Sequence, residues 1–92
     1  MGYHVIVKRR AEKELDRLDA KIRTLLLKYL FDTLEGCENP KGIQGAKPLE
    51  GVKNGWRWRV GVYRTLGTVE EKTITIEIFR IGHRRDVYRT LP

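Results

Sequence analysis

Residues 56–60, with the sequence WRWRV, alternate bulky apolar side chains with arginines. Successive side chains of a β-strand point to opposite faces of its sheet. The alternation therefore predicts a strand that buries both tryptophans and Val60 against a core and holds Arg57 and Arg59 together on the opposite face. A chain with this strand is constrained to a layered fold, in which one sheet face is covered and the other carries fixed positive charge.

Composition sets the size of the fold and the class of partner. The 92 residues make a single domain, which we expect to span residues 1–92. The net charge of +7 and the pI near 9.9 favour a polyanion as partner. Nucleic acid comes first and an anionic membrane second, although an acidic protein fits the charge equally well.

The compartment is indicated by cysteine usage and hydropathy. Cys37 is the only cysteine, which excludes an internal disulfide and is typical of a reducing environment. The N-terminus lacks the apolar run of a signal peptide, and no apolar stretch approaches the roughly 20 residues that span a bilayer. We therefore expect a cytoplasmic protein without a membrane partner.

The N-terminal part of the chain predicts one strand and two helices. Residues 3–7 are rich in β-forming side chains, whereas residues 8–19 place apolar side chains at the three- and four-residue spacing of an amphipathic helix. Asp19 can cap a second helix that runs to Glu35, where Gly36 is a natural stop. Two helices joined this tightly form an antiparallel hairpin.

A loop rich in glycine and proline follows the helices. It covers residues 37–55, and Leu49 and Val52 are expected to pin it to the body of the domain. Loops of this length in a small domain are often functional. The remainder of the chain predicts three strands. The first covers residues 56–60, the second runs from residue 62 to residue 67 or 69, and the third covers residues 73–81.

The last predicted strand has the clearest pattern. Ile74, Ile76 and Ile78 point to one face, a turn at residues 70–72 precedes the strand, and Gly82 ends it. The order β-α-α-β-β-β predicts an α+β fold, with the helical hairpin packed on one face of a mostly antiparallel four-stranded sheet. The other face is expected to stay open to solvent and to carry the cations.

Arg57 and Arg59 are the first candidate ligands for phosphate, because guanidinium groups bind phosphate oxygens in a bidentate manner. The outer face of a half-exposed strand also needs polar residues, which is the commoner explanation of a single arginine. A cluster of arginines favours the binding interpretation, since like charges across a sheet repel and imply a compensating anion. Lys47 and Lys53 of the loop extend the basic surface toward a long polyanion.

Arg64 joins this face only under one condition. If the alternation ran unbroken from residue 56, Arg64 would point into the core, where an isolated charge is costly. A turn or bulge at Gly61 resets the alternation and places Arg64 on the open face instead.

The tail, with the sequence IGHRRDVY at residues 81–88, supplies Arg84, His83 and Tyr88. Histidine titrates near neutral pH, and tyrosine can donate a proton or stack on a base, so both are candidates for acid–base work beside a phosphate. A surface histidine and a packing tyrosine are the alternatives that residue type leaves open. The two histidines and single cysteine of the chain do not make a metal site, and we expect neither metal nor cofactor.

Three segments together resemble the RelE/ParE toxin superfamily: KPLEG at residues 47–51, WRWRVGVYR at 56–64 and RIGHRRDVY at 80–88. The resemblance extends over nearly the whole chain, because the leading strand and helical hairpin also fit. It implies a bacterial or archaeal type II toxin–antitoxin system. RelE-like members are endoribonucleases that cut mRNA in the ribosomal A site, whereas ParE-like members poison DNA gyrase.

The resemblance also implies roles for individual residues. The cationic positions that bind near the scissile phosphate fall on Arg57 and Arg59, where the best-known ribonucleases often have lysine. Arginine is a poor general base, so proton abstraction does not fall naturally to either of them. The catalytic candidates are Arg64, Arg84, Tyr88 and His83, and the substrate-binding candidates are Arg57, Arg59, Lys47 and Lys53.

The function expected on these grounds is that of a metal-independent mRNA endoribonuclease that inhibits translation on the ribosome. The 2′-hydroxyl of the substrate attacks the adjacent phosphorus and leaves a 2′,3′-cyclic phosphate. Arg64 and Arg84 neutralise the transition-state charge, and Tyr88 or His83 handles the protons. A ParE-like gyrase poison and a non-catalytic RNA-binding domain are the alternatives.

A protein partner is expected as well. An open cationic face on a small core suits an acidic segment that folds on binding. The resemblance implies that this partner is a cognate antitoxin, and that the toxin–antitoxin complex can bind operator DNA through the antitoxin. We expect the antitoxin to cover Arg57, Arg59 and Arg84.

Overall fold

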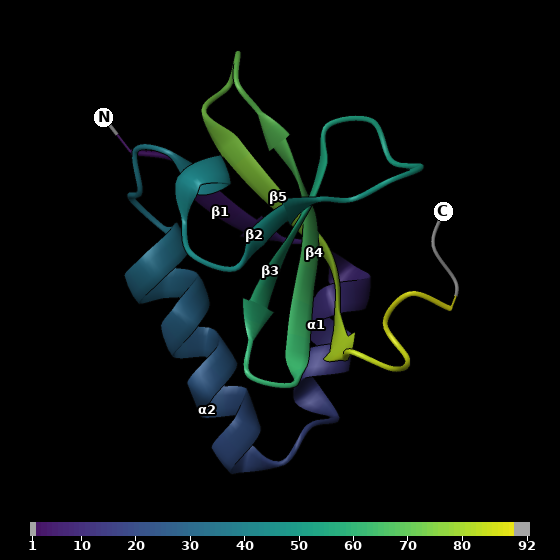
Figure 1. Cartoon of the computed structure of the whole chain (residues 1–92). Coiled ribbons are helices and arrows are strands. Elements are labelled where there is room, and N and C mark those ends of the chain that lie inside the picture. The colour runs from purple at the N-terminus through teal and green to yellow at the C-terminus, as the bar shows by residue number, and fades with distance from the viewer. Residues whose placement is uncertain (1, 90–92) are drawn as a thin grey trace.

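A mixed five-stranded sheet forms the centre of the computed structural model, which describes residues 2–89 (Figure 1). The strands lie in the order β1-β5-β4-β3-β2, with β1 parallel to β5 and the other three pairs antiparallel. The elements in chain order are β1 (His4–Val7), α1 (Arg9–Asp16), α2 (Ala20–Lys28), the π-helical η1 (Tyr29–Leu34), the 3-10 turn η2 (Pro40–Gly42), β2 (Ala46–Pro48), β3 (Gly55–Val60), β4 (Tyr63–Glu70) and β5 (Thr75–His83).

The predicted α+β class and the order of its elements are confirmed, but the sheet has one strand more than the four expected. The additional strand, β2, lies inside the segment predicted as a loop and pairs antiparallel with β3. It is only three residues long and ends in Pro48, so it carries no alternating pattern that a sequence could reveal. Backbone pairing to β3, rather than its own side chains, makes it a strand.

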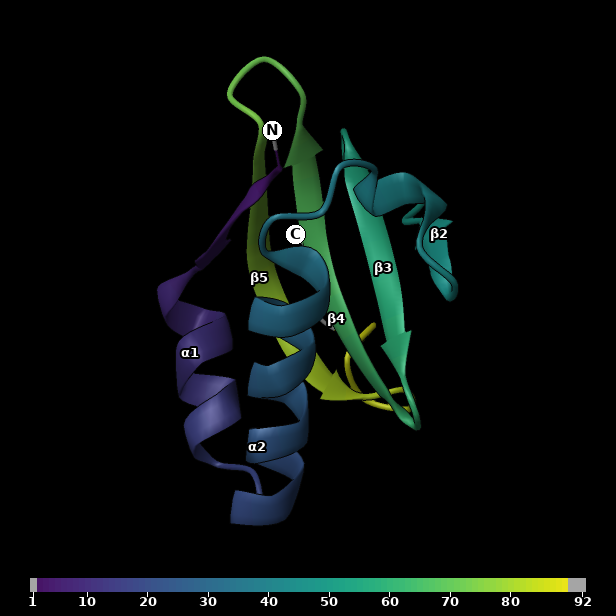
Figure 2. The same ribbon diagram turned by 90° about the vertical axis from the view of Figure 1, so that its left-hand side faces the viewer.

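Both helices cover the same face of the sheet, which is the predicted arrangement (Figure 2). Trp58 is fully buried beneath them, and its indole Nε1 donates a hydrogen bond to the carbonyl oxygen of Pro40 at 2.8 Å. Val60 is buried, and Trp56 packs against the same core, so the expected inward face of β3 is confirmed. The other buried members of this core are Ala11, Leu15, Leu26, Leu30, Leu34, Val69, Ile76, Ile78 and Ile81.

The opposite sheet face is not wholly open, contrary to expectation. A second, small apolar cluster lies on it, made of the buried side chains of Leu49, Leu66 and Val87. Val52, Phe79 and Tyr88 pack around these three. The predicted anchoring of the loop by Leu49 and Val52 is therefore confirmed, and the C-terminal segment covers part of the face that was expected to be bare.

The helical hairpin differs from the prediction mainly at its ends. The first helix ends at Asp16 rather than Asp19, and Asp19 precedes the second helix at the N-cap position without a side-chain capping hydrogen bond. The second helix widens into the π-helical η1 before it ends. Gly36, the predicted stop, has a φ of 83°, which is the left-handed conformation that favours glycine at a helix end.

β5 departs from the prediction at both ends. Ile74 is wrongly placed in the strand, because it lies in the preceding turn with a φ of 50° and is 38% exposed. The strand does not end at Gly82 but continues through His83. The pairing with β4 also shifts in register between Leu66 and Gly67, which leaves Phe79 as an extra, unpaired residue of β5.

A carboxylate on α1 fastens the helix to β5 at this irregular point. Oε2 of Glu14 accepts a hydrogen bond from Nε of Arg80 at 3.0 Å, and Oε1 accepts one from the backbone N–H of Ile81 at 2.9 Å. The Arg80 side chain is only 8% exposed. A buried guanidinium loses much of its hydration, so its carboxylate partner contributes more than a surface ion pair does.

We expect Glu14→Ala to lower the free energy of unfolding by about 2–3 kcal/mol, because it removes the carboxylate from a buried arginine and the acceptor from the Ile81 amide. Glu14→Gln keeps an acceptor for that amide, so its free energy of unfolding should fall by less. Urea denaturation of both variants measures the effect, with Glu12→Ala on the same helix as the control. Equal stability of Glu14→Ala and Glu12→Ala would show that the pair contributes nothing to the fold.

Candidate polyanion-binding site

The turn between β3 and β4 determines which cations share a face. Gly61 has a φ of 62°, as the first central residue of a two-residue hairpin turn requires, and Val60 and Tyr63 pair on either side of the turn. Arg59 therefore lies directly opposite Arg64. This register confirms the predicted reset at Gly61.

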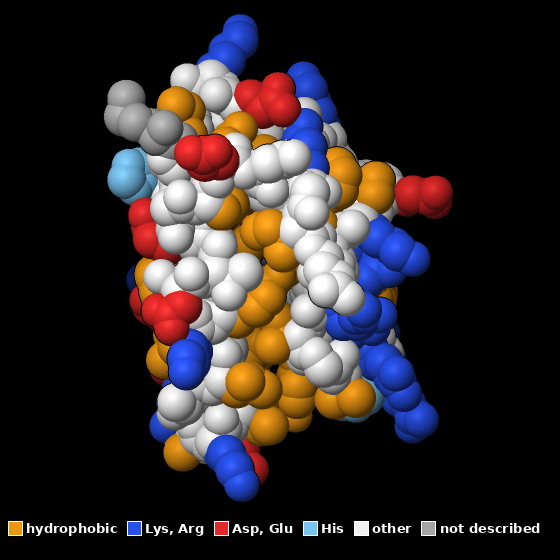
Figure 3. All heavy atoms as spheres, turned by 60° about the vertical axis from the view of Figure 1, so that its left-hand side comes forward, with side chains coloured by type: hydrophobic (Ala, Val, Ile, Leu, Met, Phe, Trp, Pro, Cys, Tyr) orange, Lys and Arg blue, Asp and Glu red, His pale blue; other side chains and the backbone are white. Residues whose placement is uncertain are grey.

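Three arginines and a lysine line this face, which points away from the helices. Arg57 lies opposite Leu66 on β4 and opposite Lys47 on β2, so its side chain shares a face with both. Arg59 and Lys47 are exposed, whereas Arg57 and Arg64 are partly buried. In Figure 3 a run of Lys and Arg side chains follows the right-hand side of the molecule, away from the helices. We call Arg57, Arg59 and Arg64 the arginine cluster.

Arg64 is held by backbone acceptors. Its Nη1 donates to the carbonyl oxygens of Gly61 and Tyr63 at 3.0 and 2.9 Å. None of the ion pairs within residues 2–89 involves a member of the arginine cluster. The guanidinium is thus oriented by the turn and retains its positive charge for an external anion.

The electrostatic environment of Arg64 reflects this crowding. Partial burial lowers the pKa of its guanidinium, and repulsion from Arg57 and Arg59 lowers it further. Electrostatic attraction to the Tyr88 side chain and, to a lesser extent, hydrogen bonding with it raise the pKa and so oppose this shift. The concentration of positive charge here therefore costs electrostatic free energy, and a bound phosphate would reduce that cost.

The C-terminal segment brings Tyr88 to this cluster. The backbone N–H of Arg84 donates to the carbonyl oxygen of Val62 at 2.8 Å, which fixes the start of the segment beside the β3–β4 turn. Val87 is fully buried on the second apolar cluster, and Tyr88 packs there too. Tyr88 therefore lies beside Arg64, and Arg84 is exposed next to the turn that carries Arg59 and Arg64.

His83 lies on the other face of the sheet. It pairs with Tyr63 in the register of β4 and β5, and the two rings meet edge to face with centroids 5.8 Å apart. Its Nδ1 accepts a hydrogen bond from the backbone N–H of Arg85 at 3.1 Å. The structure thus brings Tyr88, but not His83, to the arginine cluster.

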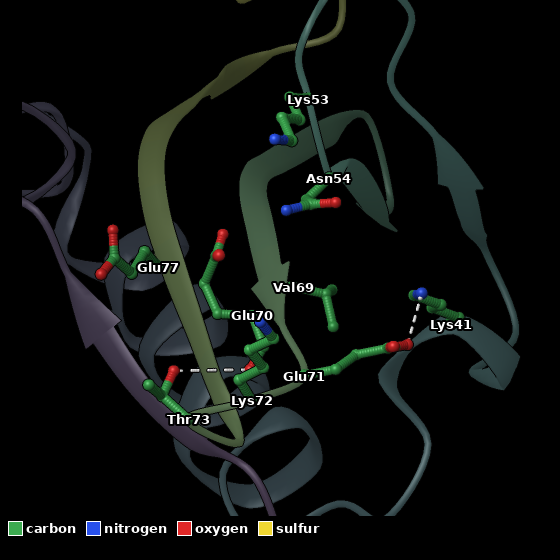
Figure 4. A pocket seen from close by; sticks show the side chains of 9 residues that line it. All are labelled: Lys41, Lys53, Asn54, Val69, Glu70, Glu71, Lys72, Thr73 and Glu77. Atoms are coloured by element: carbon green, nitrogen blue, oxygen red, sulfur yellow. Dashed lines mark hydrogen bonds and ion pairs between the residues drawn. The ribbon is translucent and has the colours of Figure 1, made fainter.

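Lys53 also lies apart from the arginine cluster. It lines a pocket at the other end of β3, together with Asn54 and the turn between β4 and β5 (Figure 4). Across this pocket Nζ of Lys41 and Oε2 of Glu71 form an ion pair at 2.7 Å. The pocket mixes lysines with glutamates, so it lacks the single sign of charge that marks the arginine cluster.

Residues 2–89 also bear on metal binding and membrane insertion. No three His, Cys, Asp or Glu side chains of residues 2–89 gather as the ligands of a metal ion would. Within the same residues, no helix has the length and apolar character needed to cross a membrane.

The fold and the site together define a class: a small α+β domain whose sheet carries clustered guanidinium groups beside one tyrosine. The chain belongs to the family of ParE toxins of type II toxin–antitoxin systems, whose family model matches residues 5–88, and thus to the RelE/ParE superfamily. The predicted resemblance is confirmed. The protein is a toxin of a type II toxin–antitoxin system.

Individual relatives support the same assignment. The chain is 29% identical over 90 residues to toxin RelG of Mycobacterium tuberculosis, with 97% of this chain and 99% of RelG covered. Toxin RelE of the same organism is also 29% identical over 90 residues, with coverage of 98% and 90%.

Solved structures show the same fold. The RelBE2 toxin–antitoxin complex of M. tuberculosis matches with a TM-score of 0.76 and 25% identity, covering 91% of this chain and 100% of that one. The archaeal RelE–RelB complex of Pyrococcus horikoshii matches with a TM-score of 0.73 and 27% identity, covering 95% and 100%.

The second apolar cluster, which lies beside the arginine cluster, was not predicted. Leu66, Val87 and Phe79 form it with the loop residue Leu49, and it seats the segment that carries Tyr88. Leu49 and Leu66 are apolar residues on a face otherwise expected to be polar, and that exception was the available signal.

We expect the arginine cluster to bind single-stranded RNA in a strongly salt-dependent manner. Each lost phosphate contact reduces the log–log slope of affinity against salt by about 0.7 on single strands. Arg57→Gln/Arg59→Gln should therefore make the slope shallower by about 1.4, as measured by fluorescence anisotropy. The control, Arg17→Gln/Lys21→Gln, lies at the end of α1 and the start of α2. It removes the same charge and should change the slope little. Equal slopes for the two double variants would place the binding face elsewhere.

Proposed function

We propose that this toxin is a ribosome-dependent mRNA endoribonuclease that inhibits translation in the cytoplasm. The observation that carries the proposal is the convergence of Arg57, Arg59, Arg64 and Tyr88 on one sheet face. Cleavage of RNA by its own 2′-hydroxyl needs positioning, charge neutralisation and proton transfer, and no cofactor. The arginines supply the first two, and Tyr88 has the hydroxyl group that the third requires.

In this mechanism the substrate's 2′-oxygen loses its proton and attacks the adjacent phosphorus. The bond from phosphorus to the 5′-oxygen breaks, the 5′-oxygen gains a proton, and a 2′,3′-cyclic phosphate remains. Arg57 and Arg59 orient the phosphate, and Lys47 on β2 adds a further contact to the RNA backbone. Arg64 and Arg84 stabilise the negative charge that builds on the phosphate oxygens.

Tyr88 is the better placed of the two candidates for proton transfer. It lies beside Arg64, whereas the ring of His83 rests on Tyr63 on the opposite face. Lys53, at the other end of β3, contacts the RNA away from the scissile phosphate.

We expect Arg64→Ala and Arg84→Ala each to lower the rate of cleavage of ribosome-bound mRNA by roughly 10²–10³-fold, because one lost transition-state contact typically costs about 2.7–4 kcal/mol. Both side chains are at least partly exposed, so the variants should remain folded. Primer extension of mRNA ends measures cleavage, and circular dichroism verifies folding. Undiminished cleavage in both folded variants would remove these arginines from the mechanism.

Gyrase poisoning is the second candidate function, because the matching family model is that of ParE toxins. Expression of the wild-type chain distinguishes the two activities. New mRNA ends without DNA breaks support the ribonuclease, and DNA breaks with intact mRNA support the gyrase poison. Salt-dependent RNA binding with neither lesion identifies a non-catalytic RNA-binding domain.

The partner proposed for this toxin is an antitoxin with an acidic segment that folds over the arginine cluster. Complementary charge supports it, because no carboxylate among residues 2–89 forms an ion pair with the cluster. The matched M. tuberculosis and P. horikoshii structures are themselves toxin–antitoxin complexes. The resulting complex binds operator DNA through the antitoxin.

We expect the antitoxin to protect the Arg57, Arg59 and Arg84 side chains from chemical modification by phenylglyoxal, because its acidic groups occupy the anion site. Arg9, exposed on α1, serves as the internal control. Peptide mass spectrometry of the free toxin and the complex measures the modification at each position. Full modification of all three in the complex would show that neutralisation does not proceed by direct masking.

A further inference from the structure

His83 forms the junction between β5 and the segment that carries Tyr88. It is the last residue of the strand, and its backbone carbonyl accepts hydrogen bonds from the amides of Asp86 and Val87 at 2.9 and 3.0 Å. Its side chain adds a third bond, since Nδ1 accepts from the Arg85 amide at 3.1 Å. His83 therefore accepts hydrogen bonds from three successive backbone amides of the turn.

The side-chain bond determines the proton positions on the ring. Because a backbone N–H can only donate, Nδ1 must present a lone pair, and the ring proton of the neutral imidazole then lies on Nε2. In this state neither ring nitrogen is free to take a proton from a substrate. The edge-to-face contact with Tyr63, at an interplanar angle of 77°, holds the ring in this orientation.

The turn that His83 closes determines where Tyr88 lies. Only four residues lie between His83 and Tyr88, and one of them, Val87, is fully buried on the second apolar cluster. Burial of Val87 and the hydrogen bonds to His83 together fix the chain on both sides of the turn. Tyr88 follows directly, and its side chain reaches Arg64.

We propose that His83 is a positioning residue: its unprotonated Nδ1 closes the turn that places Tyr88 beside Arg64. Its effect on cleavage rests on the proposed ribonuclease function, whereas its effect on the turn does not. The geometry is that of an Asx-turn, in which a side-chain oxygen accepts the amide two residues further along the chain.

Three substitutions at His83 separate positioning from chemistry. In His83→Asn the side-chain oxygen lies where Nδ1 does, two bonds from Cβ, and can accept the Arg85 amide. In His83→Gln the oxygen lies one bond further out, near the place of Nε2, and His83→Leu has no acceptor. The two readouts are hydrogen exchange of the Arg85 and Val87 amides by NMR, and the single-turnover cleavage rate of ribosome-bound mRNA.

We expect His83→Asn to keep both the amide protection and the cleavage rate near those of the wild type. His83→Gln and His83→Leu should lose roughly five-fold in amide protection, the factor that one hydrogen bond provides. The cleavage rates of these two variants should fall together with the amide protection, while KM changes little. In the background of Tyr88→Phe, His83→Leu should cause no further loss, because residues that act as one unit are not additive.

Two results would overturn the proposal. If His83→Asn protects the Arg85 amide but cleaves as poorly as His83→Leu, the imidazole itself performs chemistry. If His83→Gln and His83→Leu keep full amide protection, the side chain does not close the turn. The exchange measurement requires no activity, so a wild-type protein that fails to cleave RNA would disprove the proposed function without affecting the test of the turn.

Discussion

Gly61 and Val62 close β3 onto β4, and the length of this turn decides which face of the sheet is positively charged. With two residues in the turn, Arg59 pairs with Arg64 and Val60 with Tyr63. A slip of one residue would send every side chain of β4 to the other face, so that Arg64 would meet the helices and the buried Thr65 would meet solvent. The positive φ of Gly61 makes this turn accessible without strain. The arginine cluster is thus a consequence of hairpin geometry.

The concentration of charge that results is tolerated because the rest of the fold stabilises it. Arg64 is partly buried and lies near Arg57 and Arg59, and both conditions lower the pKa of its guanidinium. The carbonyl oxygens of Gly61 and Tyr63 partly offset this repulsion. On the covered face, the core around Trp58 carries the stability of the sheet. The cations are therefore fixed before any anion arrives, and fixed charges stabilise a transition state without reorganisation.

Sequence periodicity was sufficient for the class of fold and for the shared face of Arg57 and Arg59, because both depend on the alternation of strands, whereas for Arg64 it left open whether Gly61 resets that alternation. It was insufficient wherever distant segments decide the outcome. β2 is a strand only because β3 pairs with it, and the bulge at Phe79 arises where β5 meets both β4 and α1. The position of His83 shows the same limit. Its tail location predicted proximity to the arginines, but its partner in the β4–β5 register places it on the opposite face.

The proposed ribonuclease mechanism raises one chemical question, which is how a site rich in arginine would remove a proton from the RNA. Arginine stays protonated, and the lone pair of His83 Nδ1 is occupied by the Arg85 amide. Positive charge beside an oxygen acid favours its ionised form, and this applies to a 2′-hydroxyl held against the arginine cluster. The cluster can thereby reduce the basicity that proton removal demands. In that mechanism the Tyr88 hydroxyl can take part in proton transfer only if the tail holds it within reach. In the proposed mechanism, proton transfer by Tyr88 would thus depend on the turn at His83, and we propose that His83 contributes by its position rather than as a base.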